Sequence, residues 1–150
     1  MPRARLSADE CGTASLEFVT AGLVLLLPLV YLVLTMSAIQ AGALAVEGAS
    51  RHAARVFVQA PDAAEASARA QRAVEVALAD YGIDADTASI SVSCQPRPSE
   101  CLTRRGFVTI TVATSVPLPL VPPVLDLDLA LQVPLSSTAT QQVSRFWGAG

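Results

Sequence analysis

An uncharged apolar run near the N-terminus constrains the fold of this chain more than any other feature. No Asp, Glu, Lys, Arg or His occurs from Phe18 to Val46. Because a membrane-spanning helix needs about 20 apolar residues, the run is long enough to cross a bilayer once. We therefore predict a transmembrane and juxtamembrane helical stem over residues 13–57, in which Pro28 is tolerated as in other membrane helices. A short polar leader at residues 1–12 precedes the stem.

A second helix is expected over residues 61–81. Asp62 and Glu65 have the spacing of a capping box, in which the first side chain accepts a hydrogen bond from the backbone N–H of the second. Apolar residues then recur at helical intervals. Gly82 follows them, and helices commonly end at a glycine. These signals predict an amphipathic helix that packs on the sheet described next.

From residue 87 onward the apolar residues alternate with polar ones, which is typical of half-buried strands. This alternation predicts three strands, over residues 90–94, 108–112 and 125–133. A weaker fourth strand is expected in residues 135–143. The segment 116–123 carries four prolines and is expected to be a crossover or an edge, because proline cannot donate to a β-ladder.

The predicted fold class is α+β. It consists of the long N-terminal membrane-spanning helix stem, a second amphipathic helix, and a small antiparallel β-sheet of three to four strands. Residues 58–150 are expected to form a single extracytoplasmic α+β domain, with the apolar stripe of the second helix and the apolar face of the sheet covering one another.

Two cysteines lie close together in the C-terminal part of the chain. Cys94 and Cys101 are separated by six residues, and such pairs outside the cytoplasm usually form disulfides. In the chain-entropy model, closing this loop stabilises the fold by about 2–3 kcal/mol. Two free thiols are the alternative. A zinc site is not expected, because two cysteines and the distant His52 do not make a ligand set.

No catalytic constellation or phosphate-binding loop occurs in the sequence. The single histidine has no nucleophile and no orienting partner near it in the sequence, as a catalytic triad would need. The net charge is −3, and no run of basic residues interleaved with aromatic ones suggests nucleic acid. We therefore expect a protein that is not an enzyme, takes no cofactor or metal, and does not bind nucleic acid.

The residues at the mouth of the apolar run follow a recognisable order. Gly12 is followed by Thr13-Ala14-Ser15-Leu16, then by Glu17 and Phe18, and then by the uncharged run. This order resembles the type III prepilin signal of type IV pilin-like proteins, and it is most similar to that of the TadE/TadG-like pseudopilins of the tight-adherence (Tad/Flp) pilus system. The resemblance covers residues 1–57 and extends weakly to the strand-rich tail.

The resemblance implies a processing event and an assembly site. A membrane-bound prepilin peptidase would cut between Gly12 and Thr13 on the cytoplasmic side. Glu17 would then be the fifth residue of the mature chain and Phe18 the sixth. In such assemblies the glutamate of one subunit attracts the new amino terminus of a neighbour, an attraction that a low dielectric strengthens.

The implied partners are membrane lipid, the peptidase, other pilin-like subunits and the pilus assembly platform. The implied location is the cell membrane, crossed once, with the N-terminus cytoplasmic and the C-terminal domain extracytoplasmic. The count of basic residues on the two flanks of the run is a tie, so this orientation follows from the leader and the expected disulfide.

Three alternatives remain open from the sequence. Ala43-Leu44-Ala45 fits a signal-peptidase site, which would release a secreted domain beginning at Val46. An uncleaved single-span anchor carrying an external binding domain would keep Met1. In the third alternative, Glu17 has no role in assembly and only marks the membrane boundary, with its side chain extending to water.

Overall fold

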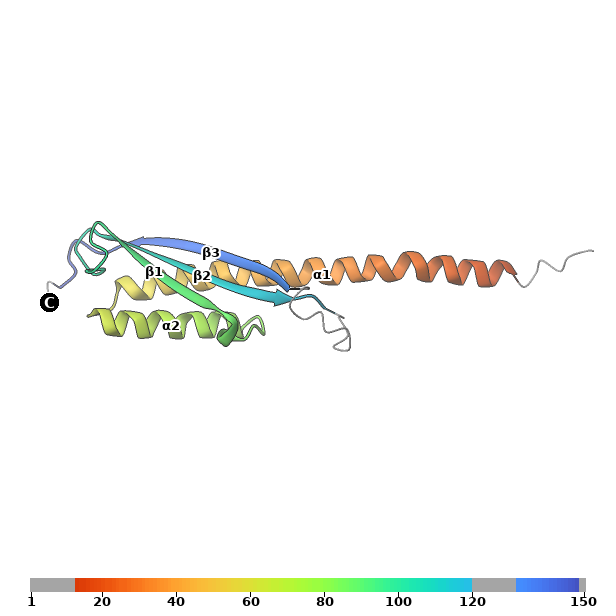
Figure 1. Cartoon of the computed structure of the whole chain (residues 1–150), viewed down its shortest axis with the longest axis horizontal. Coiled ribbons are helices and arrows are strands. Elements are labelled where there is room, and N and C mark those ends of the chain that lie inside the picture. Colours follow the sequence, from red (N-terminus) through yellow and green to blue (C-terminus); the bar gives the residue numbers. More distant parts are fainter. Residues whose placement is uncertain (1–12, 120–131, 149–150) are drawn as a thin grey trace, which may run out of the picture.

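The computed structural model describes residues 13–119 and 132–148, and it has the α+β class that the sequence predicts. The 46-residue helix α1 comes first and is followed by α2, the short 3-10 helix η1 and three strands (Figure 1). The bounds are Thr13–Val58 for α1, Ala63–Ala79 for α2, Ala85–Thr87 for η1, Ser89–Gln95 for β1, Phe107–Pro117 for β2 and Gln132–Gln142 for β3.

Helix α1 has a bare half and a packed half. All described side chains from Ser15 to Leu34 are exposed, and Figure 1 shows this part projecting well beyond the rest of the molecule. The packed half begins near Gly42 and lies against α2, β2 and β3. Its buried positions recur every three to four residues, which is the period of one helix face. They are Gly42, Ala45, Val46, Ala49, Ser50, Ala53, Ala54 and Phe57.

Gly42 lies where the helix comes closest to the sheet. A Cβ atom at this position would stand 2.6 Å from a methyl group of Val116 on β2 and 2.7 Å from one of Leu135 on β3. Eight residues further along the same helix, the hydroxyl of the fully buried Ser50 lies 3.2 Å from that of Ser137 on β3. At Gly42 and Ser50 the helix thus contacts the sheet directly, so the packed half of α1 is part of the folded domain.

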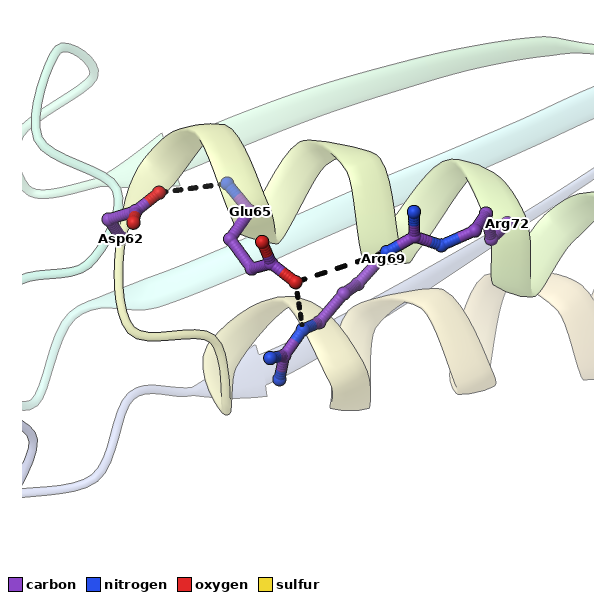
Figure 2. A network of polar contacts seen from close by, with 4 residues as sticks. All are labelled: Asp62, Glu65, Arg69 and Arg72. Atoms are coloured by element: carbon purple, nitrogen blue, oxygen red, sulfur yellow. Dashed lines mark hydrogen bonds and ion pairs between the residues drawn. The ribbon is translucent and has the colours of Figure 1, made fainter.

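Helix α2 begins as the sequence predicts. The carboxylate of Asp62 accepts a hydrogen bond of 2.8 Å from the backbone N–H of Glu65 (Figure 2). The Glu65 carboxylate contacts two arginines on the following turns, Arg69 at 2.9 Å and Arg72 at 3.9 Å. Because these side chains are partly exposed, each ion pair contributes only a few tenths of a kcal/mol to the helix, roughly 0.2–0.5.

The end of α2 is also set by local sequence. Gly82 has a φ of +69°, a left-handed conformation that costs glycine little. Its N–H bonds to the carbonyl of Ala79, and the N–H of Ile83 bonds to the carbonyl of Leu78. This pair of bonds is the Schellman ending, so the predicted stop at Gly82 is confirmed.

The sheet is antiparallel with the order β1-β2-β3. On the central strand, every second side chain faces the helices and is buried, whereas the opposite face is lined by hydroxyls. On that face Thr109 pairs with Thr140 and Thr111 with Thr138, each pair of hydroxyls being 2.9 Å apart. The core lies between one face of this sheet and the packed half of α1, and it continues between α1 and α2. Helix α2 contributes Ala66, Ala70, Ala73, Val74 and Leu78 to it. Helix α2 packs mainly on α1, so the prediction that its apolar stripe covers the sheet was wrong.

Three of the four predicted strands are confirmed. The weaker strand predicted in residues 135–143 is confirmed as the greater part of β3. The strand predicted over residues 125–133 lies outside the described residues, except for Gln132 and Val133, which begin β3. The predicted strands over 90–94 and 108–112 are confirmed as parts of β1 and β2.

Candidate assembly site and distal groove

The bare half of α1 has the dimensions of a membrane span. Residues 18–37 cover about 30 Å at the 1.5 Å rise of an α-helix, which equals the hydrocarbon thickness of a typical bilayer, about 30 Å. None of the most apolar stretch is buried against the rest of the chain. By length and composition, α1 is the one helix in the described part of the chain that could cross a membrane.

Glu17 lies one turn inside the start of this helix. It borders a shallow apolar groove formed with Leu16, Thr20, Ala21 and Val24. The Thr20 hydroxyl donates to the Leu16 carbonyl at 2.7 Å, so it is already engaged by the backbone. No ion pair involves Glu17 among the residues that the structure describes. Among the described residues its carboxylate therefore has no charged partner on this apolar surface.

Phe18 and Thr13, which the sequence predicts to belong to the assembly and cleavage sites, both lie in α1. The Phe18 ring is 80% exposed and is available to another molecule. Thr13 is the first residue of α1, four positions before Glu17. Gly12, the other half of the predicted cleavage site, lies outside the described residues.

The predicted disulfide is present. Cys94 and Cys101 are bonded, with their Cα atoms 5.0 Å apart. Cys94 is buried at the end of β1, and the bond closes the loop that leads to β2. This loop lies at the end of the domain farthest from the bare half of α1 (Figure 1).

At this distal end the structure reveals a groove that sequence reasoning missed. The distal groove, as we call it, has a volume of about 960 Å³. Three arginines line it, together with two carboxylates and an aromatic ring: Arg97, Arg104, Arg105, Asp62, Glu100 and Trp147. The lining residues come from three parts of the chain, 61–63, 96–106 and 147–148. The adjacent arginines 104 and 105 and the lone tryptophan were the only signals in the sequence.

A chain of hydrogen bonds holds the groove together. The Arg104 Nε donates to the Trp147 carbonyl, and the Trp147 indole N–H donates to the Ala60 carbonyl, each at 2.9 Å. The Arg105 N–H donates to the Val143 carbonyl at 3.2 Å. The disulfide loop, the end of α1 and the C-terminal segment are thus tied to one another. Within the described ranges no cluster of His, Cys, Asp and Glu could hold a metal ion.

Comparison of the chain with protein-family models, with curated proteins and with solved structures gives no match. The class that the structure defines is an α+β domain carried on a helix of membrane-spanning length.

Proposed function

We propose that this chain is a pilin-like subunit of the TadE/TadG type, held in the membrane by the bare half of α1 and processed by a prepilin peptidase after Gly12. The observation that carries the proposal is the solitary carboxylate of Glu17, four residues after Thr13 on an exposed apolar helix. A charge at the centre of a membrane helix costs about 2.5–3.5 kcal/mol on insertion scales, and less near the interface, where Glu17 lies. The amino group that cleavage would create on Thr13 of a neighbouring subunit would offset that cost.

The geometry of α1 argues against a secreted domain released before Val46. Ala45 and Val46 are 1% and 2% exposed in the middle of the packed helix face. The segment removed by such a cut would include Gly42, which lies against β2 and β3. Cleavage there would take away part of the domain's own core.

One observation supports an extracytoplasmic domain. Cys94 and Cys101 form a disulfide, which is typical of oxidising compartments. Arg51 and Arg55 belong to the packed half of α1, and Arg51 pairs with Glu47, but in the sequence they lie about as near to the span as Arg3 and Arg5 do, so the count of flanking charges stays a tie.

The N-terminus of the mature protein tests the proposal. We expect a chain isolated from its native membrane to begin at Thr13, as read by mass spectrometry of the intact protein. Replacing Gly12 with a bulky residue such as Phe should block the cut, whereas Gly12→Ala should at most weaken it. A mature chain that keeps Met1 would support the plain membrane anchor, and one that begins at Val46 would support the secreted domain.

A substitution of Glu17 tests the role of its carboxylate. Glu17→Gln should leave membrane insertion intact, because the amide is uncharged. It should lower incorporation into sedimentable assemblies about tenfold, corresponding to the loss of roughly 1.4 kcal/mol. Glu47→Gln, on the packed half of α1, is the matched control. Normal assembly of the Glu17 variant would leave the carboxylate only as a marker of the membrane boundary.

A further inference from the structure

The charges of the domain are segregated between its two ends. Ion pairs join Glu47, Glu65 and Glu100 to arginines. Of the charges in the described ranges that form no ion pair, three arginines lie at the distal end beside the carboxylate of Asp62, and three aspartates lie at the end from which the bare half of α1 leaves (Figure 1). The three arginines are Arg104, Arg105 and Arg145, and the three aspartates, called the acidic end, are Asp80, Asp84 and Asp86. The other unpaired charges are Glu17, Arg55 and Glu75.

The acidic end is exposed and held by local structure. Asp80 directly follows α2 and lines a hollow with Leu44 and Tyr81, which places it beside the point where α1 leaves the domain. The Asp84 carboxylate caps η1 by accepting a hydrogen bond of 3.1 Å from the backbone N–H of Asp86. All three carboxylates project from one short segment, residues 80–86.

This arrangement is unfavourable within a single subunit. The C-terminus of a helix carries partial negative charge and prefers cations, and the N-terminus prefers anions. Yet Asp80 follows the C-terminus of α2, whose last turn has no basic residue. At the other end of α2 the preference for anions is already met, because the Asp62 carboxylate caps the helix and Glu65 lies in its first turn. The placement of Asp80 costs up to about 1 kcal/mol at the surface, and the cationic side chains of a second molecule would relieve it.

The distal groove is shaped to receive an acidic segment. It is open, and its apolar lining from Pro61, Pro96 and Leu102 lies among the three arginine side chains. Arg105 adopts a φ of +61°, which is uncommon for a residue other than glycine and costs about 1–3 kcal/mol. Arg104 is oriented by its bond to the Trp147 carbonyl. Arg97 is held by its ion pair with Glu100 at 2.9 Å. The guanidinium groups of Arg97 and Arg104 are therefore positioned before any ligand arrives.

We propose that the distal groove binds the acidic end of a second copy of this chain. Two copies with parallel stems would then be stacked head to tail, displaced along the stem by about the length of the domain. The 17 residues of α2 set that length at about 25 Å or more. The inference deepens the proposed function and rests on it for its setting, because such a displacement suits a filament and not two neighbours at one level in a membrane.

Paired charge reversals test the contact. Arg105→Glu/Arg145→Glu makes both ends of the chain acidic, and Asp80→Arg/Asp86→Arg makes both ends basic, while Asp84 keeps its cap on η1. We measure association of the full chain in non-ionic detergent by energy transfer between donor-labelled and acceptor-labelled molecules. Each variant alone should associate at least about tenfold more weakly than the natural chain. A one-to-one mixture of the two variants should associate again, because each then offers the end that the other lacks.

A control variant carries the same change of net charge as the double Arg→Glu variant, but at positions outside the proposed contact. Arg55→Glu/Arg72→Glu alters two arginines outside both the distal groove and the acidic end, and it should leave association within about twofold of the natural chain. Raising the salt concentration should weaken association of the natural chain, because these charges are exposed to solvent. Circular dichroism and the fluorescence of the lone Trp147 confirm that each variant is folded.

The inference is overturned if the natural chain does not associate, if neither reversal weakens association, or if the mixture associates no better than the variants alone. Its failure is separable from failure of the proposed function, because the assay uses the uncut chain. If the mature chain begins at Thr13 but the mixture of variants does not associate, only the head-to-tail contact is rejected. If the mature chain begins at Met1 but the mixture does associate, only the processing is rejected.

Discussion

At the residue scale, Gly42 and Gly48 occupy the same helix in opposite surroundings. A methyl group at Gly42 would meet Val116 at 2.6 Å, whereas one at Gly48 would meet nothing within 4 Å. We expect Gly42→Ala to destabilise the domain by about 1–2 kcal/mol, since overpacking costs roughly 1–3 kcal/mol and the gain in helix propensity offsets up to about 1. Gly48→Ala should stabilise it by up to about 1 kcal/mol. Urea unfolding of both variants measures the difference, and equal midpoints would show that the helix can move away from the sheet.

At the element scale, the elements with local end signals were predictable and the others less so. Asp62 and Gly82 fix α2 through hydrogen bonds to residues within four positions of themselves, so short-range pattern suffices. The strand β3 gave only a weak signal, because its outward positions carry serine and threonine and its inward ones, such as Ser137, are only half-buried against α1. Alternation of apolar residues shows that a strand is possible, but its partner strand decides whether it forms.

The two candidate sites, the start of the stem and the distal groove, also differ in how far the sequence predicts them. Glu17 and Phe18 were found from sequence because the stem needs no tertiary contact to place them. The distal groove was not, since the three segments that form it lie up to 87 positions apart in the chain. Trp147 joins it through a hydrogen bond to Ala60, and no local pattern predicts a contact over such a separation. A sequence without a basic run can therefore still fold into a molecule with a basic end.

At the scale of the whole molecule, the disulfide and α1 hold opposite ends of one long domain. The stem end depends on the contact of Gly42 with β2 and β3, whereas the distal end depends on the loop closed by Cys94 and Cys101 and on the bonds of Trp147. Loss of order at the distal end should therefore leave the stem and the acidic end in place, while it removes the basic surface from the molecule.

Replacing both cysteines by serine tests whether the disulfide holds the distal end of the domain. We expect Cys94→Ser/Cys101→Ser to lower the free energy of unfolding by about 2–3 kcal/mol, because the unfolded chain regains the freedom that the closed loop removes. Trp147, the lone tryptophan, reports on the distal end by its fluorescence during urea unfolding of the full chain in detergent. Ser99→Ala, within the same loop and exposed, is the control and should leave the midpoint unchanged. An unchanged midpoint in the double variant would mean that the hydrogen bonds of Arg104 and Trp147 hold the loop without the disulfide.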